Sequence, residues 1–159
     1  MTVLSPYHSN MTHLLNRFIE TELKQVLGKG KVVLLTGSGG HLVSEMARSC
    51  GMAGMKVVCT DFKLETAQKT MNQILDNGGD AIAIEVDVTK KVDHENALSI
   101  TIDSYGKLDY LLNGAGSNAP TPFFDISVDE WNNILAVQLT GTMLSCQVFG
   151  KYMIDQKYG

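Results

Sequence analysis

The sequence is poor in the residues that mark several classes of protein. It has 3 cysteines, 3 prolines and 1 tryptophan among 159 residues. Cys50, Cys59 and Cys146 lie far apart in apolar surroundings, which argues against a disulfide framework. The histidines have no zinc-ligand spacing with each other or with these cysteines. We therefore expect reduced, buried thiols, no bound metal and a cytoplasmic protein.

The chain also lacks long runs of one kind of residue. The net charge is -4 and no basic run occurs, so nothing favours binding to nucleic acid or to an anionic membrane surface. No apolar stretch approaches the length of a membrane span, and the first ten residues lack the basic and apolar blocks of a secretory signal. A length of 159 residues with 44% apolar residues predicts one soluble globular domain.

What the chain does have is a regular alternation of short apolar runs and segments with helical spacing. The runs predict four strands, and the segments between them predict helices. Strands are expected at residues 31–36, 57–60, 81–86 and 108–112, and helices at residues 42–51, 64–77, 92–105 and about 127–156. Because right-handed crossovers connect parallel strands, we expect a doubly wound α/β sheet of Rossmann type in the order 3-2-1-4. The 42–51 helix is expected to turn Leu42, Met46, Ala47 and Cys50 inward.

The chain divides into two parts on this pattern. Residues 10–27 have apolar residues at helical spacing, and Gly28 and Gly30 end that helix. We interpret residues 1–30 as an N-terminal helical extension and residues 31–159 as a dinucleotide-binding domain.

Candidate binding residues follow the first, second and fourth strands. The strand order reverses between strands one and four, so a crevice is expected where Gly37 and Asn113 emerge. Gly37, Gly39 and Gly40 allow the backbone to approach a pyrophosphate, and the helix behind them adds its positive dipole end. Asp61 lies 24 residues after Gly37, where a carboxylate can bind both ribose hydroxyls and repel a 2′-phosphate. This predicts NAD rather than NADP; the other interpretation of Asp61 is a solvated residue that closes a strand.

Four segments together resemble the short-chain dehydrogenase/reductase family over residues 31–159. They are TGSGG at 36–40, Asp61, DVT at 87–89 and NGAG at 113–116. The resemblance implies a pyrophosphate site at the glycine turn, an adenine site at Asp87 and Val88, and a nicotinamide ribose site at the fourth strand. The residues it places at the cofactor are Gly37, Ser38, Gly39, Gly40, His41, Leu42, Asp61, Asp87, Val88, Asn113, Gly114, Ala115 and Gly116. Within the family, the sugar-acid branch, such as D-mannonate oxidoreductase (fructuronate reductase), is most similar.

Three residues depart from the family pattern. His41 stands where many members have a glycine. Val43 replaces the last glycine of the turn motif, so we expect added bulk that shifts the following helix or weakens cofactor binding. Gln138 occupies the position of the helix asparagine that helps to organise a water relay, and its amide is displaced by one methylene.

The family's catalytic groups have no counterpart in this sequence. In the family a serine on the fifth strand and a Tyr-x-x-x-Lys pair act on the substrate, whereas no tyrosine here is followed by lysine four residues later. Relative to the family, the fold is therefore expected to stop after the fourth strand and its long helix. We expect the parent reaction to be NAD-linked hydride transfer with a secondary alcohol or ketone, with a sugar acid as the candidate substrate, and the chain alone to be inactive. The alternative is a non-catalytic dinucleotide-binding or interaction module.

The last helix predicts a partner. Trp131, Ile134, Leu135, Leu139, Val148 and Phe149 make it apolar on more than one side. The fourth strand would also leave an open sheet edge. We therefore expect a homo-oligomer formed through the last helix or through this edge.

Overall fold

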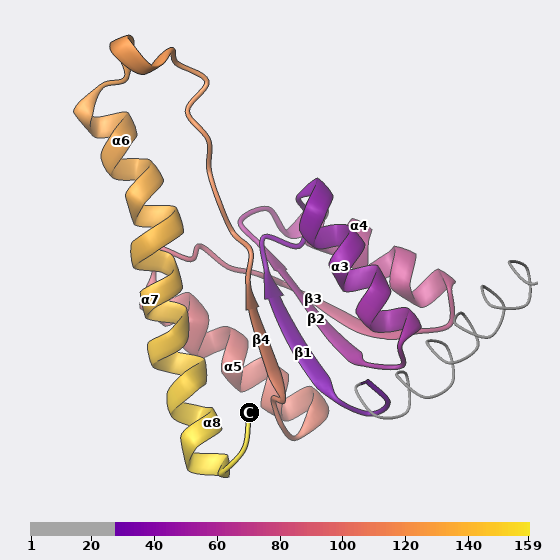
Figure 1. Cartoon of the computed structure of the whole chain (residues 1–159). Coiled ribbons are helices and arrows are strands. Elements are labelled where there is room, and N and C mark those ends of the chain that lie inside the picture. The colour runs from indigo at the N-terminus through magenta and orange to yellow at the C-terminus, as the bar shows by residue number, and fades with distance from the viewer. Residues whose placement is uncertain (1–27) are drawn as a thin grey trace, which may run out of the picture.

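The computed structural model describes residues 28–159, so the helix expected at residues 10–27 lies outside the described residues. Within the described part, the fold is the predicted α/β arrangement with a parallel sheet in the order β3-β2-β1-β4 (Figure 1). The strands are β1 (Val32–Thr36), β2 (Lys56–Asp61), β3 (Asp80–Glu85) and β4 (Tyr110–Asn113). Because all pairings are parallel, the carboxyl ends of the four strands meet at one edge.

Helices cover both faces of the sheet. On one face lie α3 (His41–Met52) and α4 (Leu64–Asp76), and on the other lie α5 (Lys91–Tyr105) and a long C-terminal helix (Figure 1). The side chains of β1 alternate between the two layers. Val32 and Leu34 pack with Phe149 of the long helix, whereas Val33 and Leu35 pack with Ala47 of α3. This burial on both faces explains why the first strand is a continuous apolar run.

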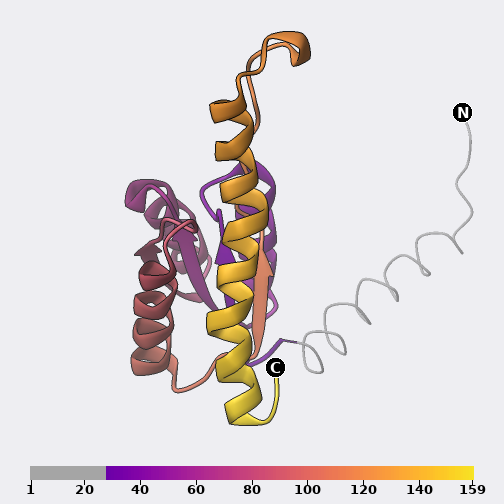
Figure 2. The same ribbon diagram turned by 90° about the vertical axis from the view of Figure 1, so that its left-hand side faces the viewer.

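The long helix follows a short 3-10 turn, η2 (Phe123–Asp125), and Ser127 caps it by accepting a hydrogen bond from the Glu130 N–H at 3.1 Å. Two π-helical segments interrupt its α-helical geometry. Its parts are α6 (Val128–Leu135), η3 (Ala136–Thr140), α7 (Gly141–Ser145), η4 (Cys146–Gly150) and α8 (Lys151–Gln156). It runs beside α5, and α6 and η2 extend past the carboxyl ends of the strands (Figure 2).

The inward face of α3 differs from the expectation. Leu42 is 66% exposed and Met46 is 39% exposed, whereas Val43, Ala47 and Gly51 are buried. The expected facing was right for Ala47 and wrong for Leu42 and Met46. The helix lies with Val43 toward β4, which turns Leu42 toward the edge where the strands end.

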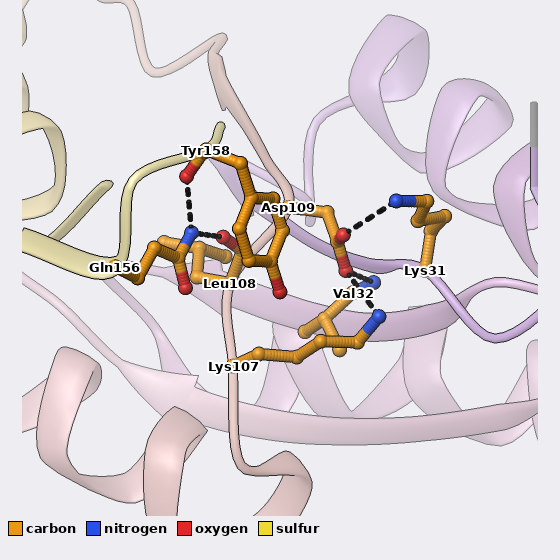
Figure 3. A network of polar contacts seen from close by, with 7 residues as sticks. All are labelled: Lys31, Val32, Lys107, Leu108, Asp109, Gln156 and Tyr158. Carbon is orange, nitrogen blue, oxygen red and sulfur yellow. Dashed lines mark hydrogen bonds and ion pairs between the residues drawn. The ribbon is translucent and has the colours of Figure 1, made fainter. Parts of the chain in front are cut away.

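Asp109 connects the amino-terminal ends of β1 and β4 (Figure 3). Its side chain is 2% exposed and accepts hydrogen bonds from the Val32 N–H at 2.8 Å and from Lys31 Nζ at 2.9 Å; it also forms an ion pair with Lys107 at 3.0 Å. Burial alone would raise the pKa of Asp109, but these three contacts outweigh it and hold the pKa below its usual value. The Lys31 ammonium lies over the Tyr158 ring, with Nζ 5.5 Å from the ring centroid. This network holds the end opposite to the predicted crevice.

Candidate functional site

A cleft lies at the carboxyl edge of the sheet, where the strand order reverses. It consists of two adjoining cavities of about 510 and 670 Å³, and both are lined by Gly37, Asp61 and Gly116. The smaller extends toward Asp87 and Val88, and the larger extends toward the start of α3. Each volume is in the range of small-molecule sites, and the shared lining makes the two one continuous cleft.

Most of the candidate residues come together here. Those lining the cleft are Gly37, Gly39, Gly40, His41, Leu42, Asp61, Asp87, Val88, Gly114, Ala115 and Gly116. Ser38 and Asn113 do not line it. Ser38 is fully buried behind the turn, and the Asn113 amide lies 3.6 Å from the Cys146 sulfur.

The glycines of the turn are required by close contacts. Gly37 has a φ of +73°, and a Cβ there would lie 2.8 Å from the Ala115 Cα. A Cβ at Gly39 would lie 2.4 Å from the Thr66 Cβ. The turn therefore packs directly against the β4 loop on one side and α4 on the other.

The N–H groups of the turn itself are largely engaged within the protein. Ser38 N donates to the Thr60 carbonyl at 2.9 Å, Gly39 N to Asp61 at 2.9 Å, and Gly40 N to the Gly37 carbonyl at 3.0 Å. The groups that face the cleft without a side-chain cap are those of the first turn of α3, beginning at His41. An anion would therefore meet the N-terminus of α3 more than the glycine amides.

Two threonines of α4, Thr66 and Thr70, form hydrogen bonds that hold the glycine turn and Asp61, and the sequence pattern did not single them out. Thr70 is 2% exposed and its hydroxyl donates to the Ser38 carbonyl at 2.8 Å. The Thr66 hydroxyl lies 2.8 Å from Asp61 Oδ1 and 2.7 Å from the Lys63 carbonyl oxygen. The signal available in the sequence was their spacing of four, which places both on one helix face.

The Asp61 carboxylate lies in the cleft and bridges α4 and the glycine turn. Oδ2 accepts from Gly39 N at 2.9 Å, and Oδ1 accepts from Thr66 and from Lys63 N at 3.2 Å. A hydroxyl has one hydrogen to donate, and Thr66 has the Lys63 carbonyl as a second acceptor. Oδ1 can therefore gain a new donor without leaving the Thr66 hydroxyl unpaired.

The loop after β3 forms the far wall of the cleft. Asp87 N donates to Asp93 at 2.9 Å, and the Asp87 carboxylate accepts from the Thr89 N–H at 3.0 Å and pairs with Lys90 at 3.2 Å. Burial alone would raise the pKa of Asp87, but the hydrogen bonds from Thr89 and the contact with Lys90 outweigh it and lower the pKa. Asp87 is therefore an ionised acceptor at neutral pH.

Gly114 accommodates the valine that replaces a glycine of the turn motif. Val43 is 7% exposed, and a Cβ at Gly114 would lie only 2.5 Å from its Cγ2. The space that a side chain at residue 114 would need is thus filled by Val43. The N–H groups of Gly114 and Ala115 both lie within hydrogen-bond distance of the Thr36 hydroxyl, at 3.1 and 3.2 Å. Val43 therefore packs against Gly114, and the expected shift of the following helix or weaker cofactor binding stays a prediction. His41 is exposed and does not close the cleft.

Gln138 lies in the π-helical segment η3 and reaches the loop after β4. Its amide nitrogen donates to the Ser117 carbonyl at 2.7 Å. The amide therefore ties the long helix to the rim of the cleft. π-Helical turns within helices are frequent at functional sites.

Residues 28–159 have neither a cluster of metal ligands nor a membrane-spanning helix. There, no three His, Cys, Asp or Glu side chains gather closely enough to hold a metal ion, and no helix combines the length and apolarity required to cross a membrane.

Comparison with known proteins agrees with this geometry. The family model for short chain dehydrogenases matches residues 31–159. The oxidoreductase UxuB of Bacillus subtilis is 32% identical over an alignment 140 residues long, which covers 79% of this chain and 50% of that protein. The 3beta-hydroxysteroid dehydrogenase 1 of Eggerthella lenta is 34% identical over 130 residues, which are 81% of this chain and 50% of that protein.

A solved structure with ligand is also similar. A Haemophilus influenza protein, provisionally assigned as a D-mannonate oxidoreductase and solved with bound NAD, is 26% identical with a TM-score of 0.74, over 79% of this chain and 51% of that one. The present chain spans about half the length of the curated relatives it matches. The match to the family model covers the whole sheet, the glycine turn and the long helix, and the chain belongs to the short-chain dehydrogenase family.

Proposed function

We propose that this chain is the NAD-binding part of an oxidoreductase that transfers a hydride between nicotinamide and a secondary alcohol or ketone. The observation that carries the proposal is the continuous cleft. It joins the N-terminus of α3, the Asp61 carboxylate and the Asp87–Val88 wall through the shared residues Gly37 and Gly116.

The cleft offers a matching group for each part of the dinucleotide. The first turn of α3 presents N–H groups for the pyrophosphate. Asp61 has lone pairs for the two ribose hydroxyls, and Thr66 can turn its hydroxyl to Lys63 as they bind. Asp87 and Val88 wall the cavity in which the adenine would lie. NAD would supply the hydride-accepting ring, and the residues of this chain would bind and orient it.

NAD is favoured over NADP by charge. The ribose 2′-phosphate of NADP would lie against the Asp61 carboxylate, which is held in place by Gly39, Lys63 and Thr66. Two anions at contact distance repel by about 4 kcal/mol near a protein surface. The carboxylate therefore acts both as the ribose acceptor and as the group that excludes the phosphate.

The substrate class proposed is a sugar acid. It is supported by the resemblance of the TGSGG and NGAG segments to that branch and by the similarity to the protein from Haemophilus influenza. A Tyr-x-x-x-Lys pair is not present in the sequence, so we expect the chain alone to bind NAD without oxidising alcohols. Reading the gene beyond Gly159 for such a pair would separate the oxidoreductase from the alternative, a non-catalytic dinucleotide-binding module.

Calorimetric titration of NAD tests the binding proposal. We expect Asp61→Ala to weaken NAD binding by about 10- to 100-fold, the loss of one or two hydrogen bonds to a charged group. The matched control is Asp76→Ala, which removes the same charge from the exposed end of α4. Equal NAD affinity for the Asp61→Ala variant and the unchanged chain would contradict the assignment of Asp61.

We also propose that two copies associate through the long helix. Trp131, Leu135, Leu139 and Met143 are 37–67% exposed and recur at every fourth residue, so they form one outward stripe. Exposed apolar stripes of this kind mark protein interfaces. Sedimentation should show a dimer that Leu139→Asp dissociates, whereas Leu75→Asp, at an exposed site on α4, should leave it intact. A dimer that survives Leu139→Asp would favour the β4 edge instead.

A further inference from the structure

The first turn of α5 holds the loop after β3, whose residues Asp87 and Val88 line the end of the cleft proposed for the adenine base. Asp93 accepts the Asp87 N–H at 2.9 Å. His94 is fully buried, and its Nε2 lies 2.9 Å from the Val88 carbonyl oxygen. Because a carbonyl oxygen only accepts, this contact assigns the hydrogen to Nε2.

The His94 ring is itself fixed by packing. It meets the Phe149 ring edge-on, with centroids 5.8 Å apart and an interplanar angle of 89°. Phe149 belongs to η4 of the long helix and is fully buried in the core beneath β1. The imidazole therefore connects the buried Phe149 ring to the Val88 carbonyl of the loop.

Val88 is also in contact with the long helix. A Cβ at Gly141 would lie 2.9 Å from the Val88 Cγ2, so the long helix packs directly against this side chain. Val88 and Asp87 line the same cavity. The His94 imidazole and the long helix therefore both restrict the position of the Val88 peptide.

We propose that His94 is a positioning residue for the base end of the dinucleotide. The inference rests on the proposed function and goes beyond it, because His94 does not line the cleft. An apolar side chain at this site would fill the space but leave the buried Val88 carbonyl without a donor. The loop would then move to reach water, and Asp87 would move with it.

The base itself supplies a reporter for this movement. Asp87 is an acceptor, so it suits the 6-amino group of adenine and repels the 6-oxo group of hypoxanthine. The ratio of affinities for NAD and for nicotinamide hypoxanthine dinucleotide therefore reports where Asp87 lies. A general loss of stability would weaken both ligands and leave the ratio unchanged.

The test is calorimetric titration of both dinucleotides with the full chain. His94→Met and His94→Val remove the donor and keep an apolar side chain, and His94→Gln keeps a donor. Thr101→Val is the matched control, because Thr101 is a fully buried residue of α5 whose hydroxyl donates to the Ala97 carbonyl at 2.7 Å, away from the loop. Either donor-free variant suffices if the other does not fold.

We expect the donor-free variants to bind NAD about tenfold more weakly, the effect of one buried hydrogen bond, and to lose most of the preference for adenine. His94→Gln should restore much of that preference for adenine. Thr101→Val should lower the melting temperature but leave the preference for adenine unchanged. If the unchanged chain binds NAD and the donor-free variants keep its base preference, the role of His94 is overturned alone. If the unchanged chain does not bind NAD, the proposed function is overturned as well.

Discussion

The contact between Val43 and Gly114 gives a quantitative prediction for the cleft. Gly114→Ala would place a Cβ 2.5 Å from Val43 Cγ2 and 3.0 Å from the Thr36 carbonyl oxygen. Carbon atoms pack at about 3.5–4.0 Å, so α3 and the β4 loop must separate. Overpacking of a well-filled core costs about 1–3 kcal/mol, and we expect about 2 kcal/mol here.

A double-mutant cycle separates this clash from other effects. Val43→Ala removes two buried methyl groups and should cost about 1.6 kcal/mol at about 0.8 kcal/mol each. Independent effects would sum to about 3.6 kcal/mol. Because the new methyl group occupies space that Val43 vacates, we expect the double variant to lose only about 1–2 kcal/mol. The coupling energy should therefore exceed about 1 kcal/mol.

Urea unfolding followed by circular dichroism measures each corner of the cycle. At about 2–4 °C per kcal/mol, Gly114→Ala should also lower the melting temperature by about 4–8 °C. The control is Gly150→Ala in the long helix, where a Cβ meets nothing within 4 Å and alanine should be neutral or stabilising. Additive losses in the double variant, or a Gly114→Ala variant as stable as the unchanged chain, would refute the proposed fit of Val43 against Gly114.

Three further predictions concern the framework of the site. Asp109→Asn should lower the free energy of unfolding by about 2 kcal/mol at pH 7. Because the folded pKa of Asp109 is lowered, its contribution to stability is present above about pH 4, the unfolded pKa, and is lost as pH falls through the folded pKa. In an acid titration, the free energy of unfolding of this variant should therefore fall less steeply than that of the unchanged chain. Thr70→Val should cost about 1–3 kcal/mol in urea unfolding, because it leaves the buried Ser38 carbonyl without its donor; no loss would exclude the pinning role. Gly37→Ala should destabilise the chain and abolish NAD binding by calorimetry, because a Cβ would lie 2.8 Å from the Ala115 Cα at a φ of +73°; retained binding would contradict this steric reasoning.

The fold could be predicted because hydrophobic period and loop chemistry agree along the chain. Residues 31–36 form an apolar run ended by glycines, and the structure places them in the centre of the sheet in the predicted order. The element bounds differ by one or two residues. β4, for example, begins at Tyr110 rather than at residue 108. Just before it, the Val32 N–H donates to the Asp109 carboxylate and not to a backbone carbonyl of β4. Such differences depend on individual hydrogen bonds, which periodicity does not encode.

The interior of the cleft could be predicted less well because it depends on contacts between distant segments. Val43 was expected to shift the following helix or to weaken cofactor binding, and only the structure shows that Gly114, 71 residues later, leaves room for its side chain. Leu42 was expected inside the core and is 66% exposed, because α3 lies with the next residue, Val43, toward β4. His94 carried no motif, and its partner Val88 became evident only from the three-dimensional arrangement.

The central claim is that the cleft holds a dinucleotide between α3, Asp61 and the Asp87 loop, and backbone amide resonances test it directly. In a nitrogen–proton correlation spectrum titrated with NAD, we predict saturable shifts at His41, Leu42, Asp61 and Val88. The amides around Asp109, at the opposite end of the sheet, should not move. Shifts that are absent, that do not saturate, or that concentrate away from the cleft would contradict the account.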